Sequence, residues 1–223
     1  ERGLSTVALA HTQDDVAETF LMRLARGAGV DGLAAMSPLW AEAGVTWQRP
    51  MLGMTRAELR HWLAMRGLHW AEDPSNDNTA FDRVKMRKAM PLLANLGLSA
   101  PRLAEVADHL AEARQALEAF ADHWAALCLT EASGTVVISP NLWQAPAETR
   151  RRLLQRVVLW IAPAAYGPRG AQVSQLLAAL TEGRSATLAG CRFARDRHGL
   201  RALREAQGLT LAEGDRACTR VFD

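Results

Sequence analysis

Cysteine and long apolar runs are both scarce in this sequence. Its 223 residues include three cysteines, Cys128, Cys191 and Cys218, which lie far apart and form no C-x-x-C pair. This spacing argues against a disulfide framework and against a cysteine-rich metal centre, and it is typical of proteins of the reducing cytosol. No run of roughly 18 apolar residues occurs either, so we expect a cytoplasmic protein without a membrane-spanning helix or a membrane partner.

Net charge is small as well. Lysine and arginine number 26 against 24 aspartates and glutamates, which leaves a formal net charge of +2. The total charge therefore predicts no partner, and charged side chains must be considered locally. The chain begins with Glu1-Arg2-Gly3, without an initiator methionine or a signal peptide, and we expect a piece of a longer protein.

The stretch from residue 9 to residue 32, LAHTQDDVAETFLMRLARGAGVDG, is the most informative part of the sequence. The apolar run over residues 6–10 predicts a buried strand, and the segment after it predicts a helix that ends at Gly27 and Gly29. Thr12 and Asp15 match a capping box at the start of that helix. The residues expected on its core face recur at intervals of three and four: Ala17, Phe20, Leu21 and Leu24.

Polar side chains gather on the opposite side of the same helix. At about 100° per residue, Asp15, Glu18 and Arg26 share one stripe, and His11 ends the strand above it. Because ligands of open α/β sheets bind at the carboxyl ends of the strands, these residues are candidate catalytic or binding groups. An equally good interpretation is that Asp14, Asp15 and Glu18 complement the helix dipole. The spacing suits no standard zinc site, but the carboxylates, Asp15 first, could hold Mg²⁺ beside a phosphate.

These residues resemble a known family signature. The run from His11 to Thr19, followed by Arg26-Gly27-Ala28-Gly29 and Gly32-Leu33, is similar to the H-H-x-D-D-Q-A-E-T … R-G-x-G-x-x-G-L signature of the tRNA(Ile)-lysidine synthetases, which are PP-loop ATP pyrophosphatases. Thr12 stands where this family usually has a second histidine, and Val16 where it has glutamine. The resemblance implies substrate or ATP contacts at Asp14, Arg26, Gly27 and Gly29.

Two further segments resemble the same family. Residues 49–52 look like its R-P-L-L element, and the residues alone allow Arg49 to face a phosphate or Pro50 simply to set an extended approach to a helix. Residues 70–76 match W-x-x-D-P-S-N, and their Asp73 and Asn76 are also typical of an ordinary turn. Residues 81–87 match an aromatic followed by R-N-x-x-R, except that Val84 replaces the asparagine.

Basic residues follow that turn on a predicted helix. Four of them fall within six positions: Arg83, Lys85, Arg87 and Lys88. Such runs usually form a solvated face, but directly after a rigid polar turn they could contact phosphates of ATP or RNA. The nearby Trp62 and Trp70 are expected in packing rather than as platforms for base stacking.

A domain boundary is expected over residues 95–101, NLGLSAP. Beyond it, apolar residues recur at intervals of three and four from Leu103 to Leu127, which predicts one long amphipathic helix. A strand over residues 135–139, a helix after Pro146 and a closing hairpin over residues 183–203 follow, and this hairpin resembles the substrate-binding region of the lysidine synthetases. Four arginines without evident balancing acids decorate the helix after Pro146, and they are candidates either for RNA-backbone contacts or for a solvated face: Arg150, Arg151, Arg152 and Arg156.

The resemblance implies an α/β fold followed by a mostly helical α+β part. Residues 1–96 would form the C-terminal part of a PP-loop domain with the adenine nucleotide alpha hydrolase-like fold. Residues 97–223 would form a helical tRNA- or substrate-binding domain with a small β hairpin. The S-G-G-x-D-S phosphate loop of the family does not occur in the 223 residues. We expect this loop to precede Glu1, and we expect the 223 residues alone to be inactive.

The activity implied is that of an ATP-dependent carbon–nitrogen ligase. It joins free L-lysine to C2 of the wobble cytidine of an isoleucine tRNA through an adenylated intermediate, with ATP and Mg²⁺. The resemblance implies catalytic residues at His11, Asp15, Glu18 and Arg83, further substrate or ATP contacts at Arg49, Asp73, Asn76 and Arg87, and RNA contacts at Lys85 and Lys88. The rival hypothesis is a non-catalytic RNA-binding or interaction module whose main surface is formed by Arg150–Arg156. The sequence predicts no oligomeric state.

Overall fold

The computed structural model describes residues 5–71, 78, 80–164, 166–196 and 199–205. The chain forms two compact units, Glu1–Gln115 and Ala116–Asp223, and each is described by itself. Helix α5 (Ala100–Cys128) begins in the first unit and ends in the second. The functional boundary expected at residues 96 and 97 stays a prediction. No helix in the described part of the chain is long and apolar enough to span a membrane.

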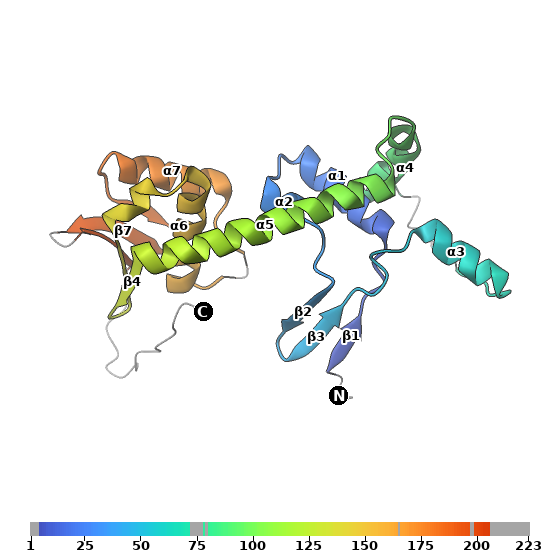
Figure 1. Cartoon of the computed structure of the whole chain (residues 1–223), viewed down its shortest axis with the longest axis horizontal. Helices are drawn as coiled ribbons and strands as arrows, with labels where there is room; N and C mark the ends of the chain where they lie inside the picture. The colour runs from blue at the N-terminus through green and yellow to red at the C-terminus, as the bar shows by residue number, and fades with distance from the viewer. Residues whose placement is uncertain (1–4, 72–77, 79, 165, 197–198, 206–223) are drawn as a thin grey trace. The chain divides into compact units, whose positions relative to one another are not determined.

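A mixed sheet of three short strands belongs to the first unit (Figure 1). Strand β1 (Thr6–Ala8) pairs in parallel with β3 (Val45–Gln48), and β2 (Leu39–Glu42) pairs with β3 in the antiparallel sense. The expected strand at β1 is present, but it is an edge strand of this sheet and its side chains are exposed or half-buried rather than buried. The chain passes from β1 into α1 (Gln13–Ala25), so His11 and Thr12 lie between a parallel strand and a helix N-terminus.

The core of the first unit forms where α1 packs against α5. Its buried residues are Val16, Ala17, Phe20, Leu103, Ala104 and Ala107. The capping box at Thr12 and Asp15 is confirmed, since the Thr12 amide and hydroxyl both donate to Asp15 Oδ2 at 2.8 Å. The core position expected for Leu24 is wrong, because the buried residues of α1 end at Phe20 and Leu24 in the last turn is 50% exposed.

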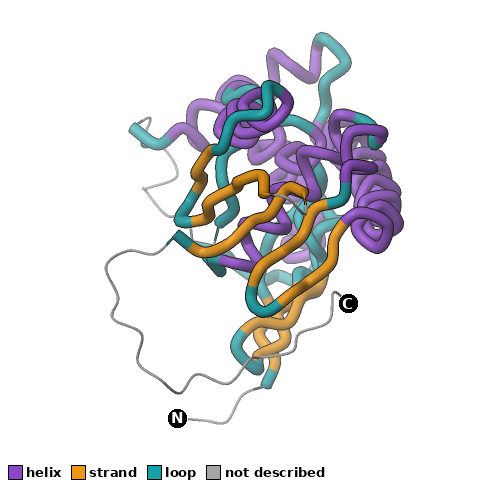
Figure 2. Tube along the Cα trace, turned by 90° about the vertical axis from the view of Figure 1, so that its left-hand side faces the viewer, coloured by secondary structure: helices purple, strands orange, loops and turns teal. Residues whose placement is uncertain are grey.

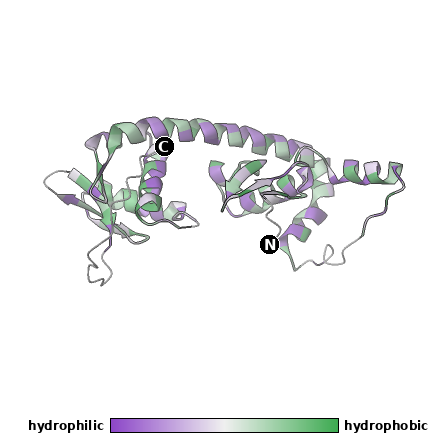
Figure 3. Cartoon of the chain, turned by 90° about the horizontal axis from the view of Figure 1, so that it is seen from below, coloured by the Kyte–Doolittle hydropathy of each residue, from purple (hydrophilic) through white to green (hydrophobic). Residues whose placement is uncertain are grey.

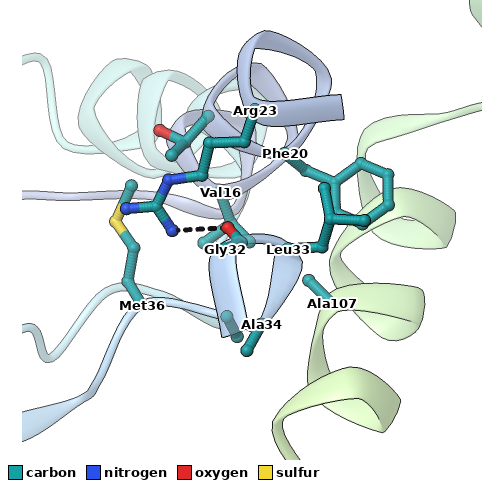
Figure 4. Close-up of a pocket in the computed structure, with 10 residues that line it drawn as sticks. Val16, Phe20, Arg23, Gly32, Leu33, Ala34, Met36 and Ala107 are labelled. Atoms are coloured by element: carbon teal, nitrogen blue, oxygen red, sulfur yellow. Dashed lines mark hydrogen bonds between the residues drawn. The ribbon is translucent and has the colours of Figure 1, made fainter. Parts of the chain in front are cut away.

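The short helix α2 (Val30–Leu33) packs closely on α1 and α5 (Figure 4). Arg23 donates from its guanidinium to the carbonyl of Gly32 at 2.9 Å, and the void that remains there has a volume of only about 10 Å³. A Cβ added at Gly32 would lie 2.7 Å from the Cβ of Ala28, and Gly27 has a φ of +71° directly after α1. Both glycines are therefore needed by the backbone of this turn.

Two more helices complete the first unit. Helix α3 (Arg56–Met65) begins at a capping box of Thr55 and Glu58, and none of its residues is fully buried. Helix α4 (Asp82–Asn95) packs beside α1 and buries Val84. This burial accounts for valine where the family has asparagine, because the side chain at this position packs in the interior.

The second unit is a five-stranded antiparallel sheet with helices on one face. Its strands are β4 (Leu129–Ala132), β5 (Thr135–Ile138), β6 (Ala186–Leu188), β7 (Cys191–Asp196) and β8 (Gly199–Arg204), in the order β4-β5-β8-β7-β6 (Figure 2). The 3-10 turn η2 (Pro140–Gln144) leads to α6 (Ala147–Ile161) and α7 (Gly170–Thr181). The hairpin expected over residues 183–203 is a run of three antiparallel strands, β6, β7 and β8, and it continues into the larger sheet through the pairing of β8 with β5.

The core of the second unit lies between this sheet and its helices. Leu153, Leu154 and Val157 of α6 pack there with Phe193 of β7. Figure 3 shows apolar and polar residues alternating along α5, as the repeat of apolar residues predicts for this helix. Cys128 and Cys191 are free and buried, and burial raises the pKa of both thiols, which is typical of packing residues rather than of reactive thiols. Cys218 lies outside the described residues.

Candidate active site

A buried carboxylate, Glu18, lies at the centre of the polar residues of α1. It is 1% exposed and contacts three guanidinium groups. Arg87 of α4 donates from Nε to Oε1 at 2.9 Å, and Arg56 of α3 lies 3.4 Å from the same oxygen. Arg83 Nε lies 3.6 Å from Oε2. The hydrogen bond to Glu18 raises the pKa of Arg87, so this guanidinium stays charged at any ordinary pH.

The burial of Glu18 corrects its expected place on an exposed stripe. Helix α4 packs beside α1 and lays Arg83 and Arg87 over the carboxylate, so this side of α1 is an internal interface. A buried carboxylate requires such partners because an unpaired charge in the interior is costly. The three arginines themselves remain 28–43% exposed and can face an anionic ligand. Glu18 therefore holds the arginine cluster (Arg56, Arg83 and Arg87) in place.

The two neighbouring aspartates have different partners. Asp14 Oδ2 accepts from the backbone amide of Arg56 at 2.7 Å, so it caps the start of α3 and ties that helix to α1. Asp15 accepts from Thr12 through Oδ2 and lies 3.5 Å from Arg56 through Oδ1. Burial raises the pKa of Asp15, but the hydrogen bonds from Thr12 and the charges of Arg56 and Arg83 lower it overall. Asp15 is therefore a firmly ionised carboxylate and a weak base.

These contacts do not fit the expected role of Asp15 as a magnesium ligand. Oδ2 already accepts two hydrogen bonds and Oδ1 faces a guanidinium, so neither oxygen is presented to a cation. Over the described residues, no group of three or more His, Cys, Asp or Glu side chains is placed to hold a metal ion. We therefore assign Asp15 to the hydrogen-bonded network and not to a metal.

His11 is held by Arg49, which follows β3. Arg49 donates from Nε to His11 Nδ1 at 3.1 Å and from a terminal nitrogen to the carbonyl of Ser37 at 2.7 Å. Its guanidinium also lies 4.2 Å from the ring centroid of Trp40, which stacks on Trp47. Burial lowers the pKa of Arg49. Because Nδ1 accepts a hydrogen bond, the proton of the neutral imidazole lies on Nε2, and His11 is a donor at that nitrogen.

Two pockets adjoin the arginine cluster and share Arg56 and Arg87. One has a volume of about 280 Å³ and is also lined by Asp14 and Glu18. The other has a volume of about 560 Å³ and includes Asp15. Small-molecule sites in proteins usually have volumes of roughly 300–1,000 Å³, so the cluster borders space of the size that a ligand needs.

Other expected site residues lie elsewhere. Arg26 and Lys85 both pair with Asp82 at the start of α4, at 3.4 and 3.1 Å, and neither lines the two pockets. Gly27 and Gly29 belong to the turn between α1 and α2. Asp73 and Asn76 lie outside the described residues. The binding roles expected for these residues, and for Lys88, stay predictions.

Three of the four arginines of α6 have acidic partners, contrary to expectation. Arg151 pairs with Glu148 at 2.6 Å, and Arg156 pairs with Asp122 of α5 at 2.5 Å. Arg152 is only 4% exposed and pairs with Glu118 of α5 as well as with Glu148. Arg150 lies 6.0 Å from the ring of Trp143. Arg152 and Arg156 therefore join α5 to α6 inside the second unit, and the four arginines do not form an unbalanced basic face.

Sequence reasoning missed Arg56. Its segment shows only a capping box, and Arg56 reaches Glu18 because Asp14 docks the start of α3 against α1. This docking joins residues far apart in the chain, and no local pattern predicts it. The stacking of Arg49 on Trp40 was missed for the same reason.

Comparison with known proteins shows the family to which the chain belongs. A family model described as a PP-loop domain matches residues 1–93. A tRNA(Ile)-lysidine synthase of Ruegeria pomeroyi is 46% identical over 216 residues, which cover 95% of this chain and 51% of that protein. Proteins of the same name from a Bradyrhizobium species and from Hyphomonas neptunium are 37% and 36% identical and cover 83% and 82% of the chain. The chain spans about half the length of these relatives, and it belongs to the tRNA(Ile)-lysidine synthase family of PP-loop proteins.

Proposed function

We propose that the protein acts as a tRNA(Ile)-lysidine synthetase, which uses ATP to join free lysine to the wobble cytidine of an isoleucine tRNA in the cytoplasm. The observation that supports this most is the arginine cluster on Glu18, which borders two pockets within the part matched by the PP-loop model. Three guanidinium groups on one buried carboxylate suit a reaction in which charged phosphates bind and leave.

The first step is adenylation of the tRNA. The O2 atom of the cytidine attacks the α-phosphorus of ATP, the bond from that phosphorus to the bridging oxygen breaks, and pyrophosphate leaves with the electron pair. Negative charge develops on the departing oxygens. Arg83 is the most exposed member of the cluster and can contact the departing oxygens. Arg56 and Arg87 line the two pockets and stabilise the same negative charge from there. His11, with its proton on Nε2, can donate to a phosphate oxygen.

The second step is attack by lysine. The neutral ε-amine attacks C2, the bond from C2 to the adenylated oxygen breaks, AMP leaves, and the attacking nitrogen loses a proton. Lysine arrives as a cation, and the negative charge of the ionised Asp15 favours that ammonium group near the pocket without accepting its proton. Asp14 lies beside it, with one oxygen already bonded to the backbone of Arg56.

Magnesium enters this proposal as the ion that accompanies ATP. The described residues offer it no cluster of three His, Cys, Asp or Glu side chains. ATP itself suits the arginine cluster, which offers partly exposed guanidinium groups to its phosphates.

Adenylation can be tested without lysine. The full-length protein is incubated with ATP labelled at the α-phosphate and an isoleucine tRNA transcript, and the label retained on the tRNA is measured. We expect label on RNA with cytidine at the wobble position and none on RNA with uridine there. Arg83→Gln should reduce the rate by on the order of 10²-fold, whereas Arg102→Gln, a matched change of an exposed arginine that pairs with Glu105 on α5, should leave it nearly unchanged. Failure of the wild type to label cytidine-containing tRNA would refute the proposed function.

A further inference from the structure

The larger of the two pockets is lined by both charged and apolar side chains. Asp15, Arg56 and Arg87 line it from the arginine cluster, while Leu59 and Leu63 of α3 and the following Trp70 line it with apolar groups. At about 560 Å³ it has the volume of a typical small-ligand site. A molecule that fills it would therefore touch both the arginine cluster and apolar side chains, among them the ring of Trp70.

Trp70 lies open in this pocket, contrary to its expected place in packing. Its side chain is 42% exposed, and the guanidinium of Arg60 lies 5.6 Å from its ring centroid. An exposed indole beside an arginine is an arrangement that binds unstacked bases of RNA, because every base has a flat π face and a neighbouring phosphate.

The charge of the surrounding helix favours the same ligand. Arg56 and Arg60 lie on α3 and Arg66 follows it directly, whereas Glu58 is the one acid within the helix. None of the α3 residues is fully buried, so this helix presents its side chains outward. A basic, partly aromatic helix complements the backbone of an RNA loop.

We propose that this pocket holds a pyrimidine nucleotide of the RNA substrate in an unstacked conformation, with its base lying on Trp70. This inference rests on the proposed function, because the nucleotide is the one that reacts. Stacking would place the base between α3 and the arginine cluster, so that its polar edge meets Arg56 and Arg87. Trp70 is then a substrate-binding residue, and Arg60 supports the ring from the side.

Trp62 provides a matched control. It follows the same pattern as Trp70, with 47% exposure and an arginine, Arg66, whose guanidinium lies 3.8 Å from its ring centroid. It does not line the pocket. A general loss of exposed tryptophan or of a cation–π contact should therefore affect both positions equally, whereas base binding in the pocket should affect Trp70 alone.

The test uses the full-length protein and isoleucine tRNA carrying photoreactive 5-iodocytidine at the wobble position. After irradiation, mass spectrometry of the digested adduct should place the crosslink on Trp70. Trp70→Ala should lower kcat/KM for tRNA by about 10-fold or more, with the KM values for ATP and lysine unchanged, and Trp70→Phe should restore most of the loss. Trp62→Ala should change kcat/KM for tRNA less than about two-fold.

A crosslink on another residue, or equal losses at Trp62 and Trp70, would overturn the inference while leaving the proposed function intact. Modification of unsubstituted tRNA by the wild type separates the two conclusions. If the wild type converts the wobble cytidine but Trp70→Ala does so at the normal rate, the pocket does not bind the reacting base.

Discussion

Replacing Glu18 with glutamine should destabilise the first unit measurably. The change keeps the shape of the side chain and removes the one negative charge that Arg56, Arg83 and Arg87 share. Removing one partner of a buried ion pair commonly costs about 3–5 kcal/mol. Because the three arginines are 28–43% exposed, water compensates part of this loss, and we expect a decrease of about 2–3 kcal/mol in the free energy of unfolding.

Urea unfolding followed by circular dichroism measures this effect directly. Glu112→Gln, which alters an exposed carboxylate of α5, serves as the control and should change stability by less than about 0.5 kcal/mol. If Glu18 instead lay on the exposed side of α1, as the helical periodicity suggests, the two variants should not differ in their free energy of unfolding. Equal stability of Glu18→Gln and wild type would therefore refute the internal ion network.

Three further predictions concern the pKa of Asp15, the burial of two leucines and the ion pairs of α6. Because the pKa of Asp15 is lowered, its contribution to stability is fully present above the ordinary carboxylate pKa and is lost as pH falls through the lowered value. When urea unfolding is measured at decreasing pH, the free energy of unfolding should therefore fall less for Asp15→Asn than for wild type. Leu154→Ala, at a fully buried site, should cost roughly 2–5 kcal/mol in thermal or urea unfolding, whereas Leu24→Ala should cost about 0.5 kcal/mol. Because Arg152 and Arg156 already pair with acids, replacing both with glutamine should change the slope of log tRNA affinity against log salt by less than about 1. A change near 2 would instead show that both arginines contact phosphates of the tRNA.

Local features of the fold could be predicted because local chemistry determines them. The capping boxes at Thr12 and Thr55 depend on residues three positions apart, and both are present. The long helix α5 follows from a repeat that continues over its whole length. The family signature also identified the segment that contains the site.

The predictions that were wrong concern packing between segments that are distant in the sequence. Glu18 and Leu24 exchange their expected environments because the position of α4 and α5 along α1, and not the periodicity of α1 alone, decides which residues are covered. Arg56 joins the site only through the docking of α3 on Asp14. The acids that balance Arg152 and Arg156 lie on another helix, so a local search for opposite charge could not find them.

Incorporation of labelled lysine into isoleucine tRNA tests the central claim most directly. The full-length protein, supplied with ATP, should transfer lysine to RNA with a wobble cytidine and should lose this activity by on the order of 10²-fold in Arg83→Gln, while Arg102→Gln retains it. No incorporation by correctly folded wild type, or full incorporation by Arg83→Gln, would contradict the assignment of the arginine cluster as the reacting centre.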